Sequence, residues 1–113
     1  VMFSISEPDW KLFRRLQPVA LDRFCQRVLA EIDHIASDAD ATHHERYLAI
    51  FQCIKQRDKE MANAFDDPRR STAIYQLAYM QSQALLTPEE MSNFSVDIRD
   101  AVSLLLGENE LET

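Results

Sequence analysis

Apolar side chains recur in alternating steps of four and three residues between residues 43 and 65. This spacing follows the 3.6-residue turn of an α-helix and is typical of a stripe that packs against other helices. One acidic residue lies within the stripe. The spacing predicts a helix over 43–65, with an inward-facing bundle seam formed by Tyr47, Phe51, Ile54, Asp58, Met61 and Phe65.

A second helix is predicted just before the first, over about 19–37. Residues 37–42 read as a turn, and Thr42 with Glu45 forms a capping box that begins the helix over 43–65. We therefore expect a central antiparallel hairpin. The apolar stripe of its first helix consists of Leu21, Phe24, Val28, Ile32 and Ile35.

Shorter helices are predicted on both sides of this hairpin. A short helix over about 7–17 precedes it, and Pro18 either kinks that helix or begins the next one. Near the end of the chain, Thr87 caps a short helix, and Ser95 caps another that Gly107 terminates.

The predicted fold class is all-α. Only one glycine occurs in 113 residues, whereas a compact β-protein needs glycine for its turns. We expect one domain over residues 1–113, built as a compact bundle of five to six helices in which a helix over 68–85 crosses the hairpin. Val1 is expected to precede the natural start at Met2, and residues 108–113 to form a frayed tail.

The helix over 68–85 is unusual because residues 71–88 contain no Asp, Glu, Lys or Arg. Apolar residues occupy one side of it, and aromatic residues occupy another. Such a helix is either central in a monomer or half covered by a second copy. The sequence favours a homodimer, with the interface predicted at Tyr75, Tyr79 and Leu86.

Charge argues against nucleic acid and membranes as partners. The net charge is −7 and the pI is near 4.8, which disfavours contact with phosphates and anionic lipids. A helix–turn–helix can be drawn over 87–107, but Asp97 and Asp100 would then repel DNA. No apolar run resembles a signal peptide or a membrane span.

The two cysteines indicate the redox environment in which the protein is expected to fold. Cys25 and Cys53 lie far apart in sequence and suit small apolar positions in a reducing cytoplasm. The size and composition resemble those of small bacterial accessory proteins.

Two arginines at a predicted helix start raise a specific question. Arg69 and Arg70 lie where exposed N–H groups favour anions. The structural interpretation pairs one of them with Asp58 and the other with Asp66 or Asp67. The functional interpretation is a small-molecule or anion pocket between helices, closed by Arg69, Arg70 and Asp58 with Tyr47 or Tyr75.

The three histidines flank the predicted turn of the hairpin. His34, His43 and His44 could gather there with nearby acidic residues, which would suit a divalent transition metal. Their spacing matches no strong metal motif, so a solvated acidic turn is the alternative.

Basic residues concentrate near the N-terminus, whereas residues from 87 onward carry seven acids and one arginine. These faces either contact each other within the fold or include a patch that docks an acidic protein. The basic residues are Lys11, Arg14, Arg15, Arg23 and Arg27.

The sequence contains no nucleophile motif, no glycine-rich cofactor loop and no dense acid–base cluster. We therefore expect no cofactor and favour a non-catalytic, homodimeric binding or regulatory protein that acts through helix-lined surfaces. The alternatives are the arginine pocket, which could belong to a small-molecule binder or an enzyme, and the histidine metal site.

Overall fold

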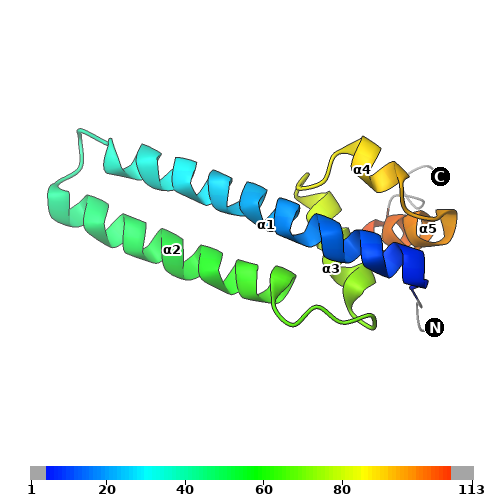
Figure 1. Ribbon diagram of the computed structural model, residues 1–113. Helices are drawn as coiled ribbons and strands as arrows, with labels where there is room; N and C mark the ends of the chain where they lie inside the picture. The colour runs from blue at the N-terminus through cyan, green and yellow to red at the C-terminus, as the bar shows by residue number, and fades with distance from the viewer. Residues whose placement is uncertain (1–4, 108–113) are drawn as a thin grey trace.

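The computed structural model describes residues 5–107, which form five α-helices and no β-strand (Figure 1). The all-α fold class predicted from the sequence is thereby confirmed. None of the helices in the described part is both long enough and apolar enough to cross a bilayer. The helices are α1 (Glu7–Ala36), α2 (His43–Phe65), α3 (Ala73–Ser82), α4 (Pro88–Ser92) and α5 (Val96–Leu106).

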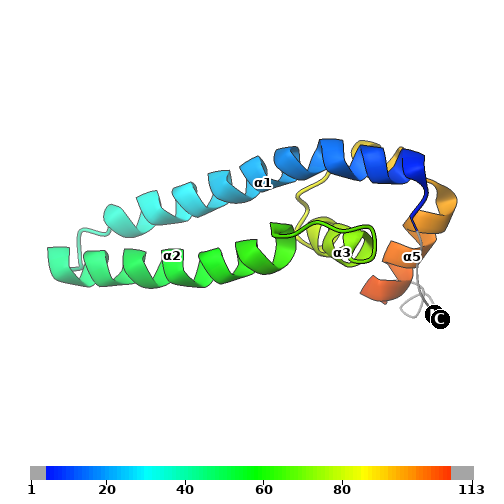
Figure 2. The same ribbon diagram turned by 60° about the horizontal axis from the view of Figure 1, so that its bottom comes forward.

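Helix α1 is a single helix of 30 residues that continues through Pro18. The predicted short helix over 7–17 and the predicted hairpin helix over 19–37 are therefore one element. Proline removes one hydrogen bond and crowds the preceding turn, which bends a helix without always ending it. Figure 2 shows α1 bent along its length.

Helix α2 begins and ends at the predicted residues. The capping box is present, since the Thr42 side chain accepts from the Glu45 amide and the Glu45 side chain accepts from the Thr42 amide. Helices α1 and α2 lie side by side and antiparallel (Figures 1 and 2). Arg46 stabilises the turn between them, because its guanidinium donates a hydrogen bond to the carbonyl oxygen of Ala36 at 2.9 Å.

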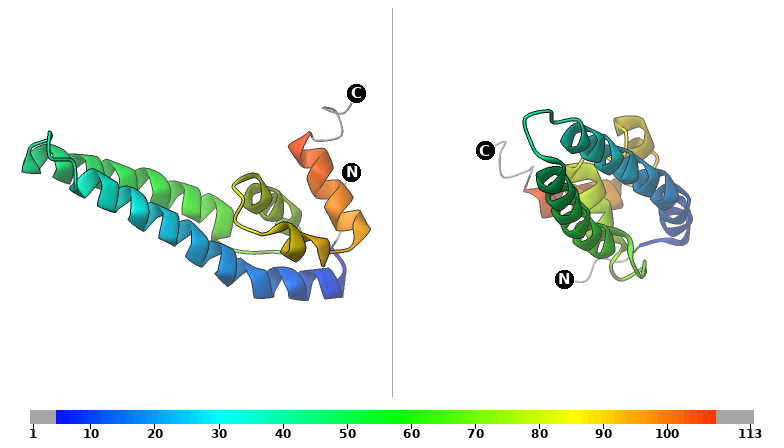
Figure 3. Two further views of the ribbon diagram at one scale, coloured as in Figure 1. Left: turned by 90° about the horizontal axis from the view of Figure 1, so that it is seen from above. Right: turned by 90° about the vertical axis from the view of Figure 1, so that its left-hand side faces the viewer.

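The far half of this hairpin projects away from the rest of the molecule (Figure 3). Beyond Phe24 in α1 and before Ala64 in α2, no residue is fully buried. The radius of gyration is 17.1 Å, whereas a compact domain of this length has one of about 13 Å. The molecule is therefore elongated, in contrast to the compact bundle predicted from the sequence.

The core lies at the other end, around α3. This helix buries six of its ten residues, and α5 and the proximal parts of α1 and α2 pack around it (Figure 1). It is shorter than the predicted helix over 68–85, because loops occupy residues 66–72 and 83–87. Asp67 and Ala84 in these loops have positive φ angles of 49° and 53°. The uncharged segment is therefore central within one chain.

Two arginines of α1 form hydrogen bonds with the loop that follows α3. Arg23 donates to the carbonyl oxygen of Leu85 at 2.8 Å and to the carboxylate of Glu90 at 2.6 Å. Arg27 donates to the carbonyl oxygens of Gln83 and Ala84. These side chains satisfy carbonyl acceptors of the loop over 83–85 and hold the loop against α1.

A buried carboxylate joins α1 to α5. Asp9 is only 5% exposed and accepts from the Ser95 amide at 3.0 Å and from the Ser95 hydroxyl at 2.7 Å. The Ser6 hydroxyl also donates to it at 3.0 Å. Burial raises the pKa of Asp9, but the hydrogen bonds from Ser95 and Ser6 outweigh burial and lower it overall.

The Arg23–Glu90 pair predicts a loss of stability in acid. Hydrogen bonds from Arg23 lower the pKa of Glu90 to about 2, from 4.5. A lowered pKa means that the ionised carboxylate stabilises the fold above pH 4.5 and that this contribution disappears as the pH falls toward 2. We expect Glu90→Gln to cost about 1–2 kcal/mol near neutral pH.

Urea denaturation of wild type and Glu90→Gln at several pH values measures this effect. The difference in unfolding free energy should shrink steadily as the pH drops from 5 to about 2. Glu89→Gln, at the exposed neighbouring position in the first turn of α4, is the matched control and should cost about 0.5 kcal/mol near neutral pH. A pH-independent difference between wild type and Glu90→Gln would exclude the ion pair as its source.

Candidate functional site

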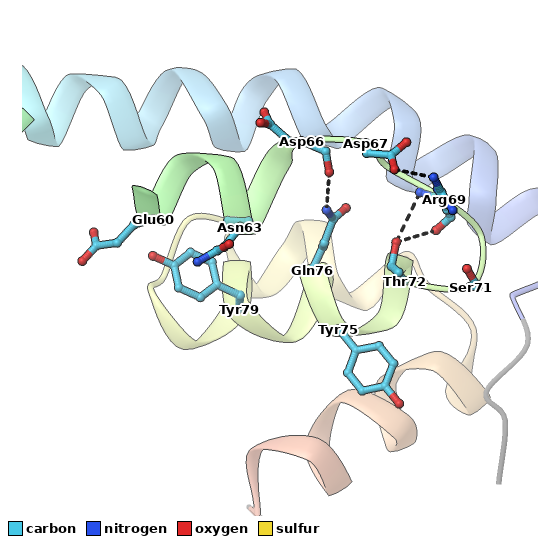
Figure 4. A pocket seen from close by; sticks show the side chains of 11 residues that line it. Glu60, Asn63, Asp66, Asp67, Arg69, Ser71, Thr72, Tyr75, Gln76 and Tyr79 are labelled. Carbon is cyan, nitrogen blue, oxygen red and sulfur yellow. Dashed lines mark hydrogen bonds and ion pairs between the residues drawn. The ribbon is translucent and has the colours of Figure 1, made fainter. Parts of the chain in front are cut away.

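A cleft of about 710 Å³ lies where α2 turns into α3 (Figure 4). Arg69 and Tyr75 from the predicted arginine pocket line it. Arg69 forms an ion pair with Asp67 at 2.7 Å, so its charge is already balanced within the loop. The other lining side chains include Glu60, Asn63, Asp66, Ser71, Thr72, Gln76 and Tyr79.

The chemistry of this cleft does not suit an anion. Its one arginine, Arg69, is paired with Asp67, and Glu60 is paired with Arg57, so Asp66 adds a further negative charge to the lining. Gln76 is 7% exposed and donates through Nε2 to the carbonyl oxygen of Asp66 at 3.1 Å. Its Oε1 atom is buried without a hydrogen-bond partner in the described part of the chain. Burial raises the pKa of Tyr79, which lies beside Glu60.

The remaining members of the predicted arginine pocket lie elsewhere. Arg70 forms an ion pair with Glu7, and its guanidinium lies 5.7 Å from the centre of the Trp10 ring. Asp58 is exposed and lies on a different side of α2, and Tyr47 is 64% exposed toward the far end of the hairpin. The predicted pairing of an arginine with Asp58 is wrong, whereas the pairing of Arg69 with Asp67 is present. Both arginines therefore have structural partners.

The three histidines lie at the turn of the hairpin and are exposed. The part of the chain that the structure describes holds no group of three His, Cys, Asp or Glu side chains placed to bind a metal ion. The predicted metal site at His34, His43 and His44 is therefore not formed, because the helices direct these side chains into solvent rather than toward one another.

The predicted bundle seam of α2 faces largely outward. Tyr47, Phe51 and Ile54 are 64%, 53% and 49% exposed, and Asp58 is also exposed. Of the six predicted seam residues, only Met61 and Phe65 pack against the core. The prediction of an inward seam is therefore wrong for the distal part of α2.

Polar contacts with α1 determine which side of α2 faces α1. The partly buried residues of α2 that face α1 each lie one position before a predicted seam residue. They are Arg46, Ile50, Cys53 and Arg57. The Cys53 thiol and the Arg57 guanidinium both donate to Glu31, each at 3.0 Å. The bond to Glu31 raises the pKa of Cys53. The bond from Arg57 is the main reason that the pKa of Glu31 falls to about 2.

The hairpin consequently has two unlike faces. On one side Arg57 bridges Glu31 and Glu60, with ion-pair distances of 3.0 and 2.8 Å, and Arg27 lies beside them. On the other side an apolar groove of about 200 Å³ runs between the helices. We call this second side the hairpin face, which comprises Cys25 and Leu29 of α1 and Tyr47, Phe51, Ile54, Asp58 and Met61 of α2.

The predicted interface on α3 is less open than the hairpin face. Leu86 is 5% exposed and belongs to the core of the single chain. Its prediction as an interface residue is therefore wrong. Tyr79 packs partly against the core, while Tyr75 is 54% exposed. Leu86 is buried because the chain folds back from α3 toward α4.

The structure divides the predicted basic patch. Arg23 and Arg27 are engaged with the loop after α3, as described above. Lys11, Arg14 and Arg15 are exposed on the first half of α1. The guanidinium of Arg14 lies 5.5 Å from the centre of the Trp10 ring.

Comparison with known proteins identifies no relative: no family model matches the chain, and no curated protein or solved structure is significantly similar to it.

Proposed function

We propose that this protein is a non-catalytic, cytoplasmic binding or regulatory protein that acts as a homodimer through the hairpin face. The observation that carries the proposal is the exposure of a regular apolar stripe along a projecting hairpin. Phe51 and Ile54 are about half exposed, and Leu29 beside them is 62% exposed. Contiguous apolar surface of this kind is typical of sites that other proteins cover.

Energetics favour covering this face. Two helices packed only against each other bury little apolar surface, and most helical stability in proteins comes from tertiary packing. Full burial of one large apolar side chain contributes about 1.5–3 kcal/mol. The exposed aromatic and aliphatic residues of the hairpin face could therefore supply most of the free energy of an association.

Alkylation of Cys25 tests this proposal in the protein as it stands. Both cysteines are free, and Cys25 lies in the groove of the hairpin face. In a Cys53→Ala background, we expect the alkylation rate of Cys25 to fall as the protein concentration rises, because association covers the thiol. A rate that does not change with concentration would contradict a homodimer through this face.

A second candidate function is a small-molecule site in the cleft between α2 and α3. Its support is the cleft of about 710 Å³ that two tyrosines line, with the buried Oε1 atom of Gln76, which has no hydrogen-bond partner among residues 5–107. Asp66, the lining acid outside the ion pairs of Glu60 and Asp67, favours a cationic amine over an anion. Protein-observed NMR with spermidine should shift Tyr75 and Tyr79 resonances, and uniform small shifts over the whole surface would remove this candidate.

A further inference from the structure

We propose that the hairpin face is covered by the same face of a second copy, seated antiparallel, so that each hairpin turn lies against the first half of the partner's α1. This inference rests on the proposed homodimer and adds its arrangement. It follows from the order of charged and apolar residues along the exposed edge of α1.

The exposed edge of α1 is basic at one end and acidic at the other end, and its middle holds Cys25 and Leu29 beside the exposed Asp22. Lys11 and Arg14 continue the line of Cys25 and Leu29 toward the N-terminus in helical steps, and Asp33 continues it by one turn toward the hairpin turn. Residues 10–21 contain no acid, and residues 29–45 contain no lysine or arginine. The edges of two copies can therefore pair opposite charges only when the two α1 helices run antiparallel.

The acidic end is reinforced by the turn itself. Asp38 and Asp40 lie in the turn, and Glu45 lies in the first turn of α2, all exposed. The basic end carries Lys11 together with Arg14 and Arg15. The acidic partner expected for these basic residues is thus present within the chain, at the other end of the hairpin.

Geometry allows the two ends to meet. Lys11 and Asp33 are 22 positions apart on one helix, which corresponds to about 33 Å along its axis. Opposing Lys11 of one copy with the 33–38 segment of the other places the two-fold axis near residues 22–25. At that position Cys25 lies near its own counterpart, whereas Leu29 faces residues 15–21 of the partner's α1, and the same contacts are exchanged in both directions, as an isologous interface requires.

A parallel arrangement would be opposed by charge. It would place acidic turn against acidic turn and basic segment against basic segment, which raises the free energy of association. The two arrangements therefore differ in their local electrostatics. Raising NaCl screens the attraction between opposite ends in the antiparallel dimer alone, while it screens the repulsion between the two net charges of −7 in both arrangements.

Pulsed electron spin resonance distinguishes the two arrangements directly. The variant Ala39→Cys in a Cys25→Ala and Cys53→Ala background carries a spin label at the hairpin turn and keeps every charge of that turn. An antiparallel dimer places the two labels about 40 Å apart, since each lies about 20 Å from the axis. A parallel dimer places them within about 20 Å, two helix diameters.

Each outcome decides a separate point. A distance near 40 Å supports the antiparallel arrangement. A distance near 20 Å overturns it and leaves the proposed homodimer in place. Absence of any dipolar signal at high protein concentration, with a monomer mass by light scattering for wild type and labelled variant, overturns both.

Discussion

Replacing Ile54 by glutamate is expected to convert the protein into a folded monomer. Ile54 lies in the groove of the hairpin face and is 49% exposed, so the single chain tolerates a charge there. In the proposed dimer the same carboxylate would be buried without a partner, which is costly. We expect the dimer dissociation constant to rise at least about 100-fold, equivalent to about 2.7 kcal/mol.

Sedimentation equilibrium measures this change, and thermal unfolding of the monomer shows whether the fold survives. Leu104→Glu is the matched control, because Leu104 is 57% exposed on α5 and lies outside the hairpin face. It should leave the dissociation constant unchanged. Equal weakening by both substitutions, or by neither, would show that the hairpin face is not the interface.

Replacing Asp9 by alanine is expected to be among the most destabilising single changes in the part of the molecule around α3. The substitution leaves the amide and hydroxyl of Ser95 without their acceptor, although Asp9 and Ser95 are 86 positions apart in the chain. Removing the charged acceptor from this part-buried network costs about 1.5–3 kcal/mol. Denaturant unfolding measures the loss.

Asp97→Ala provides the comparison for Asp9→Ala. Asp97 is an exposed acid in the first turn of α5, so its loss should cost about 0.5 kcal/mol through the helix dipole alone. A double-mutant cycle with Ser95→Ala should give a coupling energy above about 1 kcal/mol. Additive effects would mean that the contact contributes little to stability.

Local signals in the sequence were sufficient for several elements. The capping box of Thr42 with Glu45 and the spacing after it predict α2 with its correct bounds. Ser95 and Gly107 likewise mark the ends of α5. These signals act within one helical turn, so they do not depend on the rest of the fold.

The rotation of α2 could not be predicted in this way. Two adjacent lines of residues on α2 have helical spacing, and the more apolar line is the one left outside. The contacts of Cys53 and Arg57 with Glu31 select the other line, across sequence separations of 22 and 26 residues. A pattern within one helix does not report such distant contacts.

The components of the hairpin face were only partly identified. The spacing in the sequence places Phe51 and Ile54 in an internal seam, and Leu29 belongs to neither predicted stripe of the hairpin. The signal was present in the order of residues on α1, where Lys11, Cys25, Leu29 and Asp33 share one edge outside its inward stripe. Ser6 and Asp9 resemble a capping box in the sequence, but no local pattern reports the contact of Asp9 with Ser95, because Ser95 lies near the other end of the chain.

The central claim is that the hairpin face is covered by a second copy of the chain. Light scattering of the eluting wild-type protein, over a range of loading concentrations, tests it most directly. The chain mass is 13.1 kDa, so the expected result is about 26 kDa, twice that mass, at concentrations where Ile54→Glu elutes at the single-chain mass. A mass of 13.1 kDa for the wild type at every concentration would contradict the claim.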